Sequence, residues 1–313
     1  MNKINICFMG NPKFAVRTLD VLNKEEKIDI KLVVSGKDKR RSRNKFSPTP
    51  VKEYAMDHDL DVATPDSVNT EEFLETLKDL DIDFIVVVAF GQLIGKGLLG
   101  TYKDRIINLH PSLLPKYRGA APIQFTLLNG EKVTAPTTML IEKAMDAGDI
   151  LIQEEMEVAE DDDFLTLSEK LTEKGAFAIR DTLLNFDDVY KNRTKQDDSK
   201  ATFTTKINKE MGKIDWKTDM ATIHNQVRAL LAYPKAYFAY EGLDVKVLEV
   251  KKHPMDDPKP AYVYAANRDD NILIGCKDGA IEIKKIQFPG KKAMDTKSFL
   301  LGNEFKEKIY LDE

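Results

Sequence analysis

The sequence predicts an α/β protein in which an N-terminal Rossmann-like parallel sheet, with helices on both faces, precedes a small OB-like C-terminal β-barrel. Between residues 4 and 183, apolar runs alternate with segments of helical periodicity, an order typical of parallel sheets. The run 84–89 is continuous and rich in β-branched residues, which indicates a strand buried on both faces. After Tyr233-Pro234 the pattern changes to short strands separated by turns, and this spacing favours a barrel.

The first part is expected to open with a strand at 4–9, a helix at 14–22 and a second strand at 28–34. The turn after the first strand, Gly10-Asn11-Pro12, contains one glycine and no G-x-G-x-x-G, so we exclude a dinucleotide cofactor here. Apolar periodicity and cap residues place the remaining elements. Further strands are expected at 62–65, 84–89, 106–107 and 148–153, and further helices from Pro50, over 73–80 and over 161–183.

A polar stretch from Val189 to Ala201 separates the two parts and indicates a crossing between domains. We therefore expect a catalytic domain at 1–188, a linker at 189–206 and a second domain at 207–313. The second domain is expected to hold a helix with Ile223, Val227, Leu230 and Leu231, strands at 237–240, 245–250, 261–265, 272–276 and 281–286, and a last helix containing Phe299 and Leu300.

The composition describes a globular protein, with 42% hydrophobic and 32% charged residues among 313. No apolar run approaches the roughly 18 residues that span a membrane, and the first strand begins too early for a leader peptide. Cys7 and Cys276 are distant and lie in apolar stretches, which favours reduced core residues over a disulfide or a zinc site. We therefore expect a cytoplasmic monomer without metal or membrane partner. A net charge of -5 argues against indiscriminate coating of nucleic acid, but it leaves room for local basic patches.

Three polar side chains carry the predicted chemistry. Asn108 and His110 follow an apolar strand at positions i and i+2, and that spacing puts both on one face. An amide can donate to a developing oxyanion, and an imidazole can exchange a proton near neutral pH. Asp146 lies in a glycine-containing turn and adds a carboxylate. Taken singly, a histidine after a strand or an Asp-x-Gly turn also fits a structural role.

The complete sequence of the two segments around these residues favours the catalytic role over the structural one. Residues 108–124 read NLHPSLLPKYRGAAPIQ and residues 146–149 read DAGD. This pattern resembles the signature of the formyltetrahydrofolate-dependent formyltransferases, in particular those that act on methionyl-tRNA. Three later segments, 213–216, 233–234 and 290–294, resemble the C-terminal domain of the same family, which helps to hold the tRNA. The resemblance runs from about Ile4 to Phe305.

The resemblance implies a formyltransferase fold and direct transfer of a formyl group from 10-formyltetrahydrofolate to methionyl initiator tRNA through a tetrahedral intermediate. It makes Asn108, His110 and Asp146 catalytic. The first two would stabilise the oxyanion, His110 would also exchange protons, and Asp146 would orient His110 or a bridging water molecule. Arg118 is equally compatible with a loop brace and a substrate contact. The implied folate-binding residues are Phe90, Gly91, Leu93, Ile94, Ser112, Leu113, Leu114 and Pro115.

A basic run between residues 37 and 45 contains six basic residues and one acidic residue. By composition alone it fits a solvated surface loop as well as an RNA contact. In the family the matching loop reaches into the acceptor arm of the tRNA, which implies tRNA contacts by Arg40, Arg41, Arg43 and Lys45. The family usually carries Gly-Arg-Gly where this chain has Ser42-Arg43-Asn44. Two further departures are Asn11 for a usual Thr and Phe90 for a usual Tyr.

Two other functions remain open from the sequence. A sugar-nucleotide formyltransferase would use the same three catalytic residues on a small amine. A folate- or RNA-binding protein without catalysis would retain the fold, but the presence of all three polar residues argues against it.

Overall fold

The computed structural model describes residues 3–40, 46–269 and 271–311, and it leaves the side chains of Lys39 and Arg40 undescribed. The chain divides into two compact units. Unit 1 comprises Met1–Pro122, Val133–Glu157 and Ser168–Thr204, and unit 2 comprises Ile123–Lys132, Val158–Leu167 and Thr205–Glu313.

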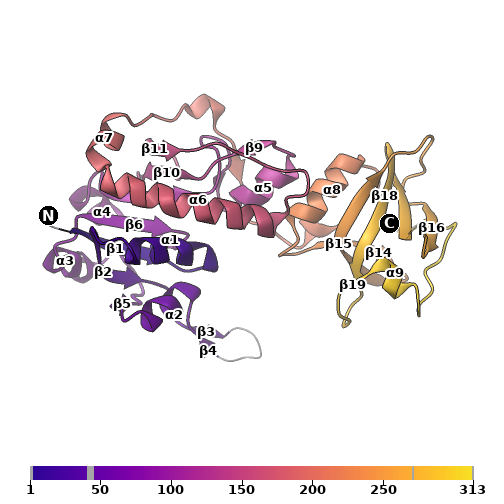
Figure 1. Cartoon of the computed structure of the whole chain (residues 1–313), viewed down its shortest axis with the longest axis horizontal. Coiled ribbons are helices and arrows are strands. Elements are labelled where there is room, and N and C mark those ends of the chain that lie inside the picture. The colour runs from indigo at the N-terminus through magenta and orange to yellow at the C-terminus, as the bar shows by residue number, and fades with distance from the viewer. Residues whose placement is uncertain (1–2, 41–45, 270, 312–313) are drawn as a thin grey trace. The chain divides into compact units, whose positions relative to one another are not determined.

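Unit 1 is built on a seven-stranded sheet with the order β11-β10-β7-β6-β1-β2-β5 (Figure 1). The neighbours β7, β6, β1, β2 and β5 are parallel, as predicted, whereas β10 runs antiparallel to both β7 and β11. No strand was predicted at the position of β10, because its short apolar run gives no periodic signal. The bounds are β1 Ile4–Gly10, β2 Ile28–Val34, β5 Val62–Ala63, β6 Phe84–Val88, β7 Ile106–His110, β10 Thr137–Leu140 and β11 Ile150–Gln153.

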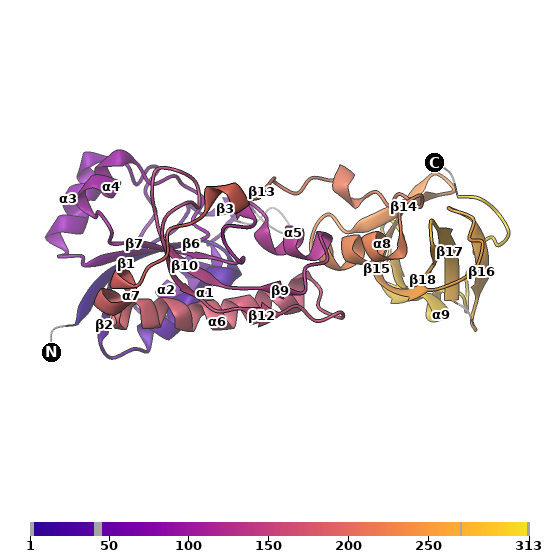
Figure 2. The same ribbon diagram turned by 90° about the horizontal axis from the view of Figure 1, so that it is seen from above.

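Helices cover both faces of this sheet, as expected (Figure 2). Along β1, Ile6 and Phe8 lie in one apolar core and Cys7 and Met9 in another, because successive strand side chains point to opposite faces. The first core also contains residues of α1 Lys13–Asn23, α2 Pro50–Asp57, α6 Phe164–Leu184 and α7 Phe186–Lys191. The second contains residues of α3 Glu71–Asp79 and α4 Lys96–Thr101. Burial on both faces explains the continuous apolar run of β6.

Helix starts follow the cap residues in the sequence. Thr49 accepts a hydrogen bond from the Lys52 amide at 3.0 Å, and Thr70 accepts one from the Phe73 amide at 3.2 Å. Asp163 accepts bonds from the Leu165 and Thr166 amides at 2.7 and 3.0 Å, so α6 begins at the next residue, Phe164. Such bonds satisfy amides that lack a partner in the first helical turn.

Three short strand pairs connect segments around the sheet. They are β3 Lys39–Arg40 with β4 Phe46–Ser47, β8 Arg118–Gly119 with β13 Phe203–Thr204, and β9 Val133–Thr134 with β12 Met156–Glu157. A 3-10 turn, η2 Asp198–Lys200, precedes β13. These two-residue pairs are too short to be predicted from periodicity.

Unit 2 contains an antiparallel sheet with the order β14-β15-β18-β17-β16, in which β19 pairs with β18. This sheet is consistent with the predicted small barrel, and Trp216, Phe238 and Phe305 lie in its core. The bounds are α5 Pro122–Leu128, η3 Glu210–Gly212, α8 Met220–Ala229, β14 Ala236–Tyr240, β15 Leu243–His253, β16 Val263–Asn267, β17 Asn271–Cys276, β18 Gly279–Gln287, β19 Met294–Asp295 and α9 Thr296–Phe299. The strand expected at 261–265 is thus shifted toward the C-terminus, and the last helix ends before Leu300.

Both cysteines are free and buried, as predicted. Within the described ranges, none of the helices combines the length and the apolarity needed to cross a membrane. Over the same ranges, no three His, Cys, Asp or Glu side chains are grouped so that they could hold a metal ion.

Candidate active site

The candidate site lies where the parallel strands of unit 1 end. The last residues of β1, β6 and β7 are Gly10, Val88 and His110. In an open α/β sheet, ligands bind in the crevice outside these carboxyl ends. Asn108 and His110 lie in β7 itself, the predicted folate-binding residues lie in the loops that follow β6 and β7, and Asp146 lies in the turn after β10.

Asn108 and His110 lie on one face of β7, as their spacing predicts. Ile107 and Leu109 belong to the first core and Ile106 belongs to the second, so Asn108 and His110 share the face of Ile106. The Asn108 side chain is half-buried, and it forms no hydrogen bond with any residue that the structure describes. Its amide donors are therefore available to a substrate.

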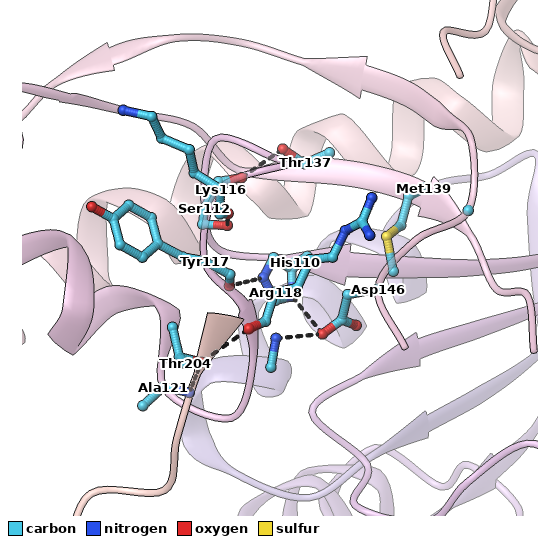
Figure 3. Close-up of polar contacts among 12 residues, drawn as sticks. His110, Ser112, Lys116, Tyr117, Arg118, Ala121, Thr137, Met139, Asp146 and Thr204 are labelled. Atoms are coloured by element: carbon cyan, nitrogen blue, oxygen red, sulfur yellow. Dashed lines mark hydrogen bonds and ion pairs between the residues drawn. The ribbon is translucent and has the colours of Figure 1, made fainter. Parts of the chain in front are cut away.

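The His110 ring is buried and its two nitrogens have different neighbours (Figure 3). Nε2 lies 2.9 Å from the carbonyl oxygen of Tyr117. A carbonyl can only accept a hydrogen bond, so Nε2 carries a proton and Nδ1 of the neutral ring has a lone pair. Nδ1 lies 3.8 Å from Oδ2 of Asp146, which is within ion-pair range but longer than a hydrogen bond. The structure thus leaves Nδ1 as the atom that can gain or lose a proton.

Asp146 is held by main-chain contacts in its turn. Its φ of 50° is left-handed, a conformation that Asp tolerates better than most residues. Oδ2 accepts a hydrogen bond from the Gly119 amide at 2.8 Å. At Gly148, an added Cβ would overlap the carbonyl oxygen of Leu140 in β10, so the turn can pack against the sheet only with glycine there. The DAGD motif therefore has a steric as well as a chemical basis.

The environment of His110 keeps its imidazole neutral. Burial is the largest effect and lowers the pKa of His110 below its ordinary value. The carboxylate of Asp146 and the bond to Tyr117 oppose this shift, whereas the guanidinium of Arg118 lowers the pKa further. Asp146 therefore favours the protonated ring and Arg118 favours the neutral ring.

The predicted folate loop after β7 is braced from within. Ser112 is fully buried, and its hydroxyl donates to the Lys116 carbonyl at 2.7 Å. Thr137 donates to the Ser112 carbonyl at 2.7 Å, and Gln153 donates to the Leu114 carbonyl at 3.1 Å. Leu114 is also buried, while Leu113 and Pro115 are half-buried. Ser112 and Leu114 thus shape this loop, and Leu113 and Pro115 offer its accessible apolar surface.

The predicted folate loop after β6 presents mainly its backbone. The Phe90 ring is buried in the second core, so only its main chain can face a ligand. Gly91 has a φ of 85°, which glycine adopts without strain. Leu93 is 79% exposed and Ile94 is half-buried. Exposed main chain beside apolar side chains suits a flat heterocycle with several donors and acceptors.

Of the predicted tRNA-binding residues, the structure describes only the backbone of Arg40, which pairs with Phe46 in the β3–β4 hairpin. Arg41, Arg43 and Lys45 lie outside the described residues.

Asn11 holds the ends of three strands together, a role that its sequence position did not suggest. Its Oδ1 accepts bonds from the Gly36 amide at 2.7 Å and the Ser35 hydroxyl at 3.0 Å, and its Nδ2 donates to the Phe90 carbonyl. Asn11 follows β1, Ser35 follows β2 and Phe90 comes shortly after β6. The substitution of Asn for the usual Thr at this position therefore supplies a side chain that joins three loops.

Of the two roles expected for Arg118, a loop brace and a substrate contact, its contacts in the structure support the loop brace. Its Nε and Nη2 donate to Oε1 of Gln196 at 3.0 and 2.8 Å, and Nη2 also contacts Oδ1 of Asp198 at 2.8 Å. Gln196 lies in the polar stretch predicted as a linker and was not a candidate. Only its position in a Gln-Asp-Asp-Ser string distinguishes it in the sequence, and no periodicity marks it.

Sequence comparison identifies the class of protein. The formyl transferase family profile matches residues 2–183, and the profile of the formyl transferase C-terminal domain matches residues 206–304. The chain therefore belongs to the formyl transferase family, whose activity is enzymatic. This confirms the resemblance carried by residues 108–124 and 146–149.

The most informative relatives are methionyl-tRNA formyltransferases. That of Finegoldia magna is 39% identical over 310 residues, which cover 99% of this chain and 100% of the relative. That of Caldanaerobacter subterraneus subsp. tengcongensis is 40% identical over 308 residues, which cover 97% of this chain and 98% of the relative. Among solved structures, the N-formyltransferase from Helicobacter canadensis, in complex with folinic acid and dTDP-3-aminofucose, shares the fold with a TM-score of 0.64 and 20% identity. That match covers 90% of this chain and 99% of that chain.

Proposed function

We propose that this chain transfers a formyl group from 10-formyltetrahydrofolate to the α-amino group of methionyl initiator tRNA. The observation that carries the proposal is the placement of Asn108 and His110 on one face at the end of β7, with Asp146 Oδ2 3.8 Å from Nδ1 of His110. Full-length relatives named methionyl-tRNA formyltransferase support the acceptor.

The chemistry needs a neutral amine, a polarised formyl carbonyl and a route for one proton. An α-amino group titrates near pH 8, so a fair fraction is neutral at physiological pH and no covalent enzyme intermediate is needed. The amine nitrogen attacks the formyl carbon, and the free amide of Asn108 stabilises the resulting oxyanion. Nδ1 of His110 accepts the proton that the amine loses and returns it to the nitrogen of the folate as the carbon–nitrogen bond breaks.

Asp146 acts on the charged form of His110. Because Nε2 holds the proton of the neutral ring, Nδ1 and the carboxylate are both acceptors until Nδ1 is protonated. The carboxylate then stabilises the imidazolium, as its upward effect on the pKa of His110 indicates. This role is more specific than the orientation of His110 expected from the sequence.

The formyl donor fits the two loops beside this site. Exposed main chain at Gly91, with Leu93 and Ile94 alongside, would contact the pterin, and Leu113 and Pro115 would contact its other side. Ser112, Leu114 and the Phe90 ring would support these loops from beneath. A formyltransferase of the same fold binds folinic acid, which supports a folate at this edge of the sheet.

The tRNA is proposed to contact the C-terminal domain and the basic residues Arg40, Arg41, Arg43 and Lys45. We retain 1–188 as the catalytic domain, 189–206 as the connection and 207–313 as the tRNA-binding domain, in a cytoplasmic monomer. The separate C-terminal profile at 206–304 supports a domain start near residue 207.

The direct test is to incubate the enzyme with 10-formyltetrahydrofolate and charged methionyl initiator tRNA, and to detect N-formylmethionine after deacylation. A dTDP-amino sugar serves as the alternative acceptor, and Asn108→Ala serves as the control with reduced activity. Formylation of methionyl-tRNA alone is the expected result. Turnover of the sugar nucleotide without that of tRNA would replace the proposed acceptor, and donor binding without turnover of either would reject catalysis.

A further inference from the structure

Gln196 contacts both segments that surround His110, although it lies 86 positions beyond it in the chain. The residue is 6% exposed. Its Nε2 donates to the carbonyl oxygens of Asp146 at 2.9 Å and Gly148 at 2.8 Å. Its Oε1 accepts from Nε and Nη2 of Arg118. Each end of the carboxamide therefore has partners that only that end can satisfy, which fixes its orientation.

The segment that carries Gln196 is bonded to other segments of unit 1 on both sides of this residue. Before it, Thr194 exchanges two backbone hydrogen bonds with Ile150 at 2.8 and 2.9 Å. After it, the Thr202 carbonyl accepts from the Arg118 amide at 2.9 Å, and the Thr202 hydroxyl accepts from the Tyr117 amide at 2.8 Å. Residues 194–204 therefore form a strap over the loops of the candidate site.

The two segments that Gln196 joins control the charge of His110. One carries Asp146, which faces Nδ1, and the other carries Arg118 and the Tyr117 carbonyl that binds Nε2. Apart from the link through Gln196, the described contacts of Asp146 join its turn to the Arg118 loop by one direct hydrogen bond, from the Gly119 amide. Movement of either segment by a fraction of an ångström would change the 3.8 Å separation between the carboxylate and the imidazole.

We propose that Gln196 is a positioning residue for formyl transfer, whose carboxamide fixes the Asp146 turn against the Arg118 loop and thereby sets Asp146 beside His110. This inference rests on the function proposed above and adds a role for the strap. Gln196 does not touch substrate; it acts through the main chain of the turn.

The variant Gln196→Glu tests whether Gln196 positions the Asp146 turn or only supports the Arg118 side chain. The substituted carboxylate still accepts from Arg118, but it places an oxygen against the carbonyls of Asp146 and Gly148 and removes both donors. We expect kcat to fall about 10- to 100-fold, as for small misplacements of catalytic groups, with KM for the formyl donor within about twofold. Asp198→Asn is the matched control from the same strap: its ion pair with Arg118 is made by a side chain that is 79% exposed, so kcat should stay within about twofold.

The wild-type enzyme is assayed first with methionyl-tRNA, because an inactive wild type would reject the proposed function and not this inference. With an active wild type, unchanged kcat in Gln196→Glu overturns the positioning role. An equal loss of kcat and of tetrahydrofolate binding also overturns the positioning role, because both losses together would mean that the whole site is disrupted. If the buried carboxylate prevents folding, Gln196→Met, which is neutral and of similar size, is judged by the same two measurements.

Discussion

At the scale of single residues, the site depends on the unequal surroundings of the two His110 nitrogens. The Tyr117 carbonyl holds the proton on Nε2, and this leaves the lone pair of the neutral ring on Nδ1, beside Asp146. A free imidazole would titrate near 6.5, but burial shifts His110 downward. The residue is therefore a base at physiological pH and is ready to accept the proton of an incoming amine.

Asn108 is the predicted oxyanion donor, and its replacement tests that role. We expect Asn108→Ala to lower kcat by roughly a hundredfold, which corresponds to about 3 kcal/mol of lost stabilisation of the transition state. KM for the folate should change little, because the amide contributes mainly after the amine has attacked. Steady-state kinetics in both substrates provide the measurement, and near-normal turnover would remove Asn108 from the mechanism.

The titration of His110 should reveal its burial and the carboxylate of Asp146. Because the folded pKa is depressed, the unfolded chain binds more protons between that value and about 6.5, so stability is lost as the pH falls through this window. NMR titration of the imidazole should give a pKa below 6.5. In Asp146→Asn it should be lower still, because the carboxylate raises it. A pKa that is unchanged or higher in this variant would contradict the proposed pairing.

At the scale of elements, the turn after β10 shows how close packing positions the proposed catalytic carboxylate of Asp146. Gly148 allows the turn to approach the β10 backbone, and Asp146 adopts a left-handed φ two residues earlier. The carboxylate direction is therefore set by the path of the main chain.

Gly148→Ala should displace this turn. The added methyl group would overlap the Leu140 carbonyl, so we expect a loss of about 1–3 kcal/mol in the free energy of unfolding and a fall in kcat. The control is Gly100→Ala in α4, where an added Cβ meets nothing within 4 Å; it should leave kcat unchanged and raise stability by at most about 1 kcal/mol. Chemical denaturation and steady-state assays measure both effects. Equal behaviour of the two variants would contradict the steric argument.

At the scale of the whole molecule, the chain forms two compact units, and it is proposed to bind two very different substrates. The folate is small and is proposed to need only the loops at the end of the unit 1 sheet. The tRNA is a large polyanion, and an enzyme with a net charge of -5 must attract it through local basic residues.

Salt should therefore weaken the binding of tRNA but not the binding of the folate. Each lost phosphate contact reduces the salt dependence of binding, so we expect KM for tRNA to rise steeply with salt in the wild type and less steeply in Arg43→Ala. Arg43→Ala should also raise KM for tRNA at low salt, while KM for the folate stays constant. Lys24→Ala, at an exposed position after α1, should change neither. Equal effects of Arg43→Ala on both substrates would exclude a tRNA-specific role.

The sequence by itself determined the two-part α/β and β architecture, the approximate positions of several helices, and the pairing of Asn108 with His110 on one face. These features depend on local periodicity, cap residues and the two-residue repeat of a strand, all of which can be read within a few neighbouring positions. A long motif also sufficed to predict the family, since residues 108–124 and 146–149 occur together.

Only the tertiary structure decided which distant groups meet. The antiparallel course of β10, the link from Asn11 to two other loops, the tautomer of His110 and the placement of Gln196 all depend on contacts between segments far apart in the chain. A polar stretch such as 189–206 gives no periodic signal, so its sequence indicates a linker whether or not a buried amide within it is bonded on both sides. Hydrogen-bond partners follow from where the folded backbone brings donors and acceptors together, and local composition does not encode that.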